Sequence, residues 1–452
     1  MTGIVAQKHL VVSWLPSIML MLVTALAAPF LGFVVRPLFI VGCFLVGWLA
    51  WSRSPEFHLQ VTIALFSSAP LLRRVVDHHL GFDPGAMMIA GPLVAIVPPC
   101  AALRDLLRSG RRHDRTLTPL FLFASCVAYS AMLTLARGEW SEAASGVLKW
   151  GSPPMYALAL HLRAASAPQL LRASAVAFAV ILPATGLYGL YQYVDPPQWD
   201  RYWLALAPIT SAGEPIPYGV RTFSTMHGPA SFATFTSLGL LLVYFSRPTW
   251  LVHILMLPAT LALLLSLYRT AWLSLSASIL FSLIFPFTRA KAAGAVLVLA
   301  AAIVIALAWT PFGDVIADRF STLMNASSDS SGEERMSEYW TLWSQPGGSL
   351  TGGGFSSGDT AVAGTPPADG MIVACWSAMG IVGGLFCLAS VMWVIGAGVH
   401  TALAGRSPEA TLLGAIACGW LVQLPLATIT SGELGFLFWA LASFSFGPQQ
   451  RL

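Results

Sequence analysis

Runs of about 18 to 22 apolar residues recur along nearly the whole chain, each long enough to cross roughly 30 Å of hydrocarbon as a helix. This pattern predicts an all-α, polytopic integral membrane protein with about 12–14 transmembrane helices. The expected spans are 11–28, 31–51, 57–72, 86–103, 118–136, 145–162, 173–192, 228–246, 249–267, 270–288, 292–309, 371–393, 409–428 and 433–447.

Two polar stretches, 193–227 and 310–370, are too long to be simple turns between these spans. The second predicts a long, partly helical outer loop on the periplasmic side. The expected organisation is a transmembrane bundle of about eleven spans over 1–309, the periplasmic loop 310–370, and C-terminal transmembrane helices over 371–452. The run 11–28 is followed at once by another span, so it is not expected to be a cleaved signal peptide.

Composition supports a membrane protein. Hydrophobic residues make up 56% of the chain and charged residues 10%, with a mean hydropathy of +0.72. A soluble domain carries roughly a quarter of charged residues, so these values exclude a cytosolic enzyme, a secreted disulfide scaffold and a disordered chain. The six cysteines occur singly in or beside apolar runs, without a CxxC pair, and imply neither a metal site nor disulfides.

The basic residues predict the orientation. Five arginines lie between 104 and 115, and with the N-terminus in the cytoplasm this loop and most other basic loops face inward, as the positive-inside rule requires. Both termini are therefore expected in the cytoplasm. Arginine outnumbers lysine 21 to 3, a bias typical of GC-rich bacterial genomes.

The soluble-enzyme motifs GxxxxGK[ST] and HExxH are absent, and no GxSxG has a plausible hydrolase frame, which directs attention to charges at the outer membrane edge. Arg221, Arg269 and Arg335 face outward in this topology. Arg269 is the only full charge between Trp250 and Pro286. It either snorkels to headgroups or pairs with an acidic loop, or it grips a phosphate in a bidentate manner.

Arg73 and Arg74, at the end of another span, form a further outward cluster with Asp77. They fit a headgroup anchor at least as well as a ligand site. The neighbouring pair His78-His79 lacks the i, i+4 spacing that would direct two imidazoles to one metal. No metal, cofactor or nucleic-acid partner is expected.

Two residues qualify chemically as a general base. His227 and Asp369 each precede a span at its outer end. The alternatives are a helix-start residue beside a Gly-Pro turn for His227 and a helix N-cap for Asp369. Four tryptophans predict either an interfacial aromatic belt or platforms for sugar rings: Trp199, Trp203, Trp340 and Trp343.

Five pieces in order resemble the O-antigen ligase and Wzy-type polymerase family over about residues 215–390. The pieces are Gly219-Val220-Arg221-Thr222-Phe223 followed by Pro229-Ala230, Tyr268-Arg269-Thr270-Ala271-Trp272-Leu273, Arg335-x-x-x-Tyr339-Trp340, Gly352-Gly353-Gly354-Phe355, and Asp369-Gly370 with Gly380-Ile381-Val382-Gly383. Members of that family have similar R-x-x-G-x-F, S-R-x-x-W-L, R-x-x-x-W, G-x-G and G-I-x-G pieces.

The resemblance implies a metal-independent membrane glycosyltransferase that acts on undecaprenyl-diphosphate-linked oligosaccharide at the outer leaflet. Outward arginines hold the diphosphate in that family, a role that carries over to Arg221, Arg269 and Arg335. A histidine occupies the base region of the ligases, whereas the corresponding position here is Asp369, eleven residues before Gly380.

This departure favours a polymerase that joins repeat units of exopolysaccharide, capsule or O-antigen, with a flippase and a chain-length regulator of the same pathway as expected partners beside the lipid bilayer. An O-antigen ligase that transfers glycan to lipid A-core is the alternative. A transporter or lipid flippase would carry ionisable residues in mid-span and broken helices around a midplane site. A non-catalytic scaffold stays open as well.

Overall fold

In the computed structural model the described residues are 2–101, 104, 115–163, 166–207, 209–246, 249–309, 313, 337, 340, 343–344, 348–355 and 370–445. Within them every regular element is a helix, and one isolated β-bridge joins Gly213 and Val220. Seven helical stretches in this part of the chain are long and apolar enough to cross a membrane. The expectation of an all-α, polytopic membrane protein is confirmed.

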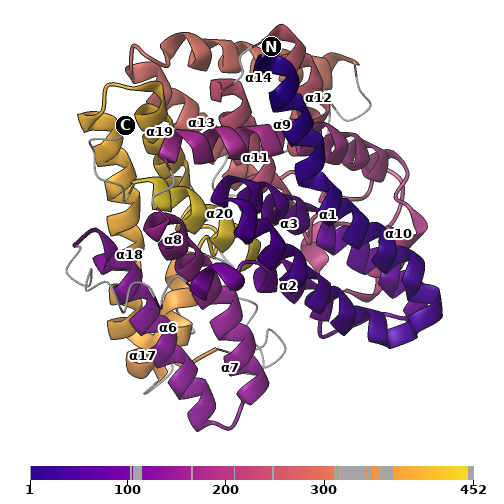
Figure 1. Ribbon diagram of the computed structural model, residues 1–452, viewed down its shortest axis with the longest axis vertical. Helices are drawn as coiled ribbons and strands as arrows, with labels where there is room; N and C mark the ends of the chain where they lie inside the picture. Colours follow the sequence, from indigo (N-terminus) through magenta and orange to yellow (C-terminus); the bar gives the residue numbers. More distant parts are fainter. Residues whose placement is uncertain are drawn as a thin grey trace. The chain divides into compact units, whose positions relative to one another are not determined.

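The α-helices of the chain are shown in Figure 1. Their bounds are α1 Thr2–Leu31, α2 Val35–Arg53, α3 Pro55–Leu80, α4 Ala90–Ala95, α6 Thr118–Ala136, α7 Trp140–Gly146, α8 Ser152–Leu162, α9 Ala167–Val194, α10 Gln198–Leu206, α11 Pro229–Ser246, α12 Trp250–Leu265, α13 Arg269–Ile284, α14 Arg289–Trp309, α17 Gly348–Thr351, α18 Met371–Ala404, α19 Pro408–Gln423 and α20 Gly432–Ala442. The bounds of α6 coincide with the expected span 118–136.

The expected span 86–103 is not one helix. It consists of two short 3-10 turns around α4, which has only six residues. Pro98 and Pro99 lack the N–H groups that would continue a helix. The segment still runs along α2, since a Cβ on Gly47 would lie 2.2 Å from the carbonyl oxygen of Ala95.

Two other expected spans are also interrupted. A π-helical segment, Val147–Gly151, separates α7 from α8 within the run 145–162. Helix α18 extends far beyond the expected 371–393 and is broken at Gly380, where φ is 70° and ψ is −178°. Only glycine adopts such a conformation without steric cost, so this residue type permits the break.

The chain forms two compact units, each built from separated parts of the sequence. Unit 1 contains 1–99, 165–275 and 282–317, and unit 2 contains 100–164, 276–281 and 318–452. The units interleave along the chain, whereas the sequence-based boundaries at 309 and 370 are consecutive and describe membrane topology. Those boundaries stay a prediction.

Unit 1 is organised around α3 and α9. Most of α3 is buried, and its apolar side chains form a core with α1 and α2 that includes Phe39, Val61 and Leu65. Helix α9 packs closely on α12, because a Cβ on Gly186 would lie 2.3 Å from the backbone nitrogen of Ala259. Small residues at such crossings allow two membrane helices to approach.

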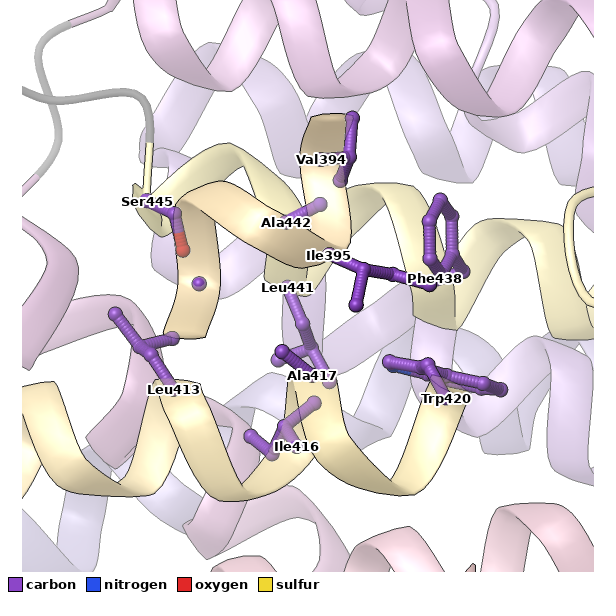
Figure 2. A pocket seen from close by; sticks show the side chains of 11 residues that line it. Val394, Ile395, Leu413, Ile416, Ala417, Trp420, Phe438, Leu441, Ala442 and Ser445 are labelled. Atoms are coloured by element: carbon purple, nitrogen blue, oxygen red, sulfur yellow. The ribbon is translucent and has the colours of Figure 1, made fainter. Parts of the chain in front are cut away.

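In unit 2, α18 packs mainly on α19 and α6, and α8 packs on α20. The Ser390 hydroxyl of α18 donates to the carbonyl oxygen of Pro119 in α6 at 2.7 Å. Figure 2 shows side chains of α18, α19 and α20 around a cavity of about 20 Å³. This volume holds roughly one water molecule, so the cavity is a packing gap and not a substrate site.

Candidate functional site

One end of unit 1 gathers the C-terminal turns of α3 and α9, helix α10 and the irregular segment before α11. Arg73 and Arg74 lie here in α3 and are buried, with 3% and 1% of their surface exposed. Asp77 accepts hydrogen bonds from Arg73 Nε at 3.2 Å and from Arg36 Nη2 at 2.9 Å. One buried carboxylate thus serves two arginines.

Arg74 is the centre of a second buried network. Its Nε donates to Asp200 Oδ1 at 2.6 Å, its Nη1 donates to the carbonyl oxygen of Met226 at 2.5 Å, and its Nη2 donates to that of Ser224. Asp200 also accepts from the Tyr188 hydroxyl at 2.9 Å. Buried charges are tolerated when they are paired and hydrogen-bonded in this manner.

Gln192 of α9 completes the network. Its Nε2 donates to Asp200 Oδ2 at 2.6 Å, and its Oε1 accepts from the backbone N–H groups of Phe223 and Ser224 at 3.1 and 2.7 Å. We call Arg74, Tyr188, Gln192 and Asp200 the polar cluster. The backbone at 223–226 is therefore held by side chains at both its N–H and its C=O groups.

The held backbone is strained. Ser224 has φ of 51°, in the left-handed region that non-glycine residues avoid, and its hydroxyl donates to the Thr185 carbonyl oxygen at 2.5 Å. Leu267, in the turn before Arg269, has φ of 53°. Strain of this kind persists only where the surroundings enforce it and is frequent at functional sites.

A backbone hydrogen bond joins the segments that carry Arg221 and Arg269. The N–H of Thr222 donates to the carbonyl oxygen of Leu265, the last residue of α12, at 3.1 Å. Arg269 is the first residue of α13. Both arginines are half-buried. The N-terminus of α13 already carries partial positive charge, so an arginine there strengthens an attraction for anions.

His227 lies two residues before α11 and is half-buried. Its ring meets the Trp203 indole edge-on, with centroids 5.5 Å apart. Trp203 is 1% exposed, and its ring lies about 6 Å from the guanidinium carbons of Arg73 and Arg74. Trp203 is therefore a buried packing residue, and its assignment to an interfacial belt or sugar platform is wrong.

Arg335 and Asp369 lie outside the described residues. Parts of unit 2 that flank them contact each other, because Gly353 N–H donates to Ser377 O at 2.7 Å and Gly354 N–H donates to Ala378 O at 2.9 Å. These carbonyls precede the break in α18 at Gly380. Two glycine pieces of the family resemblance, far apart in sequence, thus pack together.

Five of the seven sequence-predicted site residues are described, and all five belong to unit 1. The backbone bonds bring together the segments of Arg221, Arg269 and His227. Arg73 and Arg74 lie beneath them as buried ion pairs. No group of three His, Cys, Asp or Glu side chains within the described ranges could hold a metal ion.

Gln192 and Asp200 were missed from the sequence. The sequence contains a weak indication of each. Gln192 is a polar residue at the end of the apolar run 173–192, and Asp200 lies eight residues later, in the first turn of α10. Polar residues at the ends of spans are common, so neither position alone indicates a partner.

Comparison with known proteins adds no relative. No family model matches this chain, and no curated protein matches it. The resemblance to the O-antigen ligase and Wzy-type polymerase family therefore stays a prediction based on its motifs. What the structure establishes is the class of the molecule: the chain is an all-α, multi-pass membrane protein.

Proposed function

We propose that this protein is a membrane glycosyltransferase that acts on undecaprenyl-diphosphate-linked glycan and joins repeat units as a Wzy-type polymerase. The observation that carries the proposal is the hydrogen bond from Thr222 to Leu265, which brings the Arg221 and Arg269 segments together at one end of unit 1. Two guanidinium groups on adjacent segments suit a diphosphate, whose oxygens accept bidentate hydrogen bonds.

The proposed reaction needs charge stabilisation more than a metal. An acceptor hydroxyl attacks the anomeric carbon, and the bond from that carbon to the diphosphate oxygen breaks. The electron pair of this bond stays on the departing diphosphate, where Arg221 and Arg269 stabilise the developing negative charge. The hydroxyl proton passes to a general base, for which His227 and Asp369 are the candidates.

Arg73 and Arg74 take a different part in this proposal from the ligand role that their sequence suggested. Their guanidinium groups are buried and engaged with Asp77 and Asp200. Arg74 holds the carbonyl groups of Ser224 and Met226, between Arg221 and His227. We assign Arg74 to positioning of this segment, with Arg73 supporting the same end of α3.

In this proposal the end of unit 1 with the polar cluster faces the outer leaflet of a bacterial inner membrane, and both termini are cytoplasmic. The support is the charge distribution, because the arginine-rich loop 104–115 then faces inward. Partners that supply and regulate the lipid-linked units are a flippase and a chain-length regulator.

The transporter alternative is weakened by the way α18 is broken. A transporter uses broken helices to direct free backbone groups at its substrate. Here the carbonyl groups of Ser377 and Ala378, next to the break, accept hydrogen bonds from Gly353 and Gly354. The break therefore docks the chain before α18 and does not present these carbonyls to a substrate.

The test is glycan analysis in a strain lacking the gene, complemented with wild type, Arg221→Ala, Arg269→Ala or the control Arg201→Ala. Arg201 is a half-buried arginine of the same unit, paired with Asp195. We expect single lipid-linked repeat units to accumulate with Arg221→Ala or Arg269→Ala. Long chains should form with the Arg201→Ala control, at equal protein levels in the membrane.

Other outcomes separate the alternatives. Long chains that remain on the lipid carrier in the deletion strain would indicate a ligase. Absence of lipid-linked units from the outer leaflet would indicate a transporter. Polymer of wild-type length in both Arg221→Ala and Arg269→Ala would contradict the proposed diphosphate site. His227→Ala and Asp369→Ala, compared in the same strain, identify the base as the one whose loss stops chain growth while lipid-linked substrate still binds.

A further inference from the structure

A stripe of exposed side chains runs along one side of α9. Val180, Ala184, Leu187, Tyr191 and Val194 are exposed and alternate at spacings of four and three residues. The exposed fraction is 58% for Leu187 and 51% for Tyr191. This spacing places all five on one face of a helix. Because α9 is a membrane-spanning candidate, this face is its lipid-facing surface.

The stripe ends at a polar corner. Asp195 follows Val194 directly and forms an ion pair with Arg201 in α10, and 60% of the Asp195 side chain and 43% of the Arg201 side chain are exposed. An exposed ion pair is costly within hydrocarbon and stable in water or among headgroups. The boundary between membrane and water therefore passes close to Val194 and Asp195.

A small hairpin over 213–220 lies beside this end of α9, near the boundary between membrane and water. Its ends are joined by the bridge from Gly213 to Val220, and Glu214 N–H donates to Gly219 O at 3.1 Å. The tip is attached to α9, because Tyr218 N–H donates to Tyr193 O at 2.8 Å and the rings of Tyr193 and Tyr218 lie 5.8 Å apart.

The hairpin tip exposes apolar surface next to the stripe. Ile216 and Tyr218 are each 51% exposed, although Tyr218 adopts a left-handed φ of 62° that a tyrosine avoids elsewhere. Pro215 and Pro217 flank Ile216 and carry no backbone N–H that would need water. Tyrosine with proline and isoleucine is a composition suited to the headgroup level of a bilayer.

We propose that the tip 214–218 is an interfacial anchor that lies among the lipid headgroups, continuous with the lipid-facing stripe of α9. Arg221 follows Tyr218 by three residues, and its N–H donates to Ala212 O at 2.9 Å on the other arm of the hairpin. The anchor thus sets the height of Arg221 relative to the lipid phosphates. The proposal rests on the membrane fold and not on glycosyl transfer.

The test is spin-label accessibility in nanodiscs of phosphatidylcholine and phosphatidylglycerol. A nitroxide is attached at Ile216→Cys, with Leu187→Cys as the lipid control and Asp195→Cys as the reference for the membrane boundary. Cys100 and Cys418, the native cysteines that are only half-buried, are replaced by serine. We expect the label at 216 to collide with oxygen more than with a water-soluble nickel chelate, at a depth within about 5–10 Å of the phosphates.

Two outcomes would overturn the anchor. A label at 216 that meets the nickel chelate more often than the label at 195 would place the tip in water, beyond the membrane boundary. Spin–spin broadening at 216 that appears with two chains per disc and disappears with one would show that a second copy of the chain covers the tip. Gel filtration of each labelled protein verifies that it is folded, so either result is interpretable.

Discussion

Unit 1 and unit 2 each hold an irregular segment against their helices, by different means. In unit 1 the backbone at 223–226 is held by the charged and amide groups of Arg74 and Gln192, with Asp200 beneath them. In unit 2 the chain at Gly352–Gly354 is held by backbone hydrogen bonds to α18 and by close contacts that only glycines allow, while the side chains of Thr134 and Arg137 hold Phe355 beside it.

The difference shows what each arrangement can tolerate. A buried ion pair depends on charge balance, so removal of one partner is costly, whereas removal of both partners is often neutral. A glycine contact depends on volume and backbone conformation, so any added carbon atom is costly and no second substitution is an obvious rescue. Variants of the two regions should therefore fail in different ways.

The largest effect is expected for Arg74→Ala. This change leaves Asp200 buried with its charge unpaired, at a cost of about 3–5 kcal/mol in the free energy of unfolding. It also removes the donors to the carbonyl groups of Ser224 and Met226. The measurement is the unfolding temperature of the protein purified in detergent. Samples are heated to increasing temperatures, and the folded fraction that remains is measured by size-exclusion chromatography.

The double variant Arg74→Met with Asp200→Leu distinguishes the two roles of the network. We expect it to regain much of the lost stability, since no charge stays buried, but not glycan transfer, since the segment 223–226 loses its support. Equal stability of the single and double variants would contradict a charge-balance mechanism. Full activity of the double variant would contradict the positioning role of Arg74.

Gly380→Ala tests the contrasting behaviour of unit 2. A Cβ at this position would lie 2.2 Å from the carbonyl oxygen of Leu350. Overpacking costs roughly 1–3 kcal/mol, and the backbone conformation at this position, which is open almost only to glycine, costs about 1–3 kcal/mol for a residue with a Cβ. The same unfolding assay should show a clear loss, while Gly396→Ala in the same helix, where a Cβ meets no atom within 4 Å, should resemble wild type.

The helices of both regions could be predicted because their signal is local. The run 118–136 is apolar throughout and forms α6 with those bounds. The partners of the buried side chains could not be predicted. Arg74 and Asp200 are 126 residues apart, and a sequence does not show which charged residues meet in the fold. The adjacent arginines therefore looked like a lipid anchor or ligand site, although the fold buries them.

The break in α18 was equally hidden. Gly380 lies inside an apolar run that predicts an uninterrupted span, and glycine alone does not end a membrane helix. The break exists because Gly352 approaches so closely that a Cβ on it would lie 2.3 Å from the Gly380 nitrogen. Such a contact depends on tertiary structure, and the two glycine motifs gave no sign that they would meet.

Gln192→Leu should have an intermediate effect. Leucine fills a similar volume but leaves the backbone N–H groups of Phe223 and Ser224 without their acceptor. Each buried group left unsatisfied costs about 1–3 kcal/mol. Thermal unfolding should lie between wild type and Arg74→Ala. Gln192→Glu, which keeps an acceptor but adds a charge beside Asp200, should be no more stable than Gln192→Leu, and wild-type stability of both would show that Gln192 does not hold this segment.

The smallest effect is expected for Thr222→Val, and it separates stability from function. The Thr222 hydroxyl is buried and has no hydrogen-bond partner among the described residues, so an isosteric methyl group should leave the unfolding temperature unchanged or slightly raised. Thr222 also follows Arg221 and donates its backbone N–H to Leu265, a bond that valine keeps. A loss of glycan transfer at unchanged stability would therefore mean that the hydroxyl contacts the substrate beside Arg221. Unchanged glycan transfer would mean that the Thr222 hydroxyl does not contact the substrate. The backbone of this segment, Arg221 and Arg269 would then supply its polar contacts.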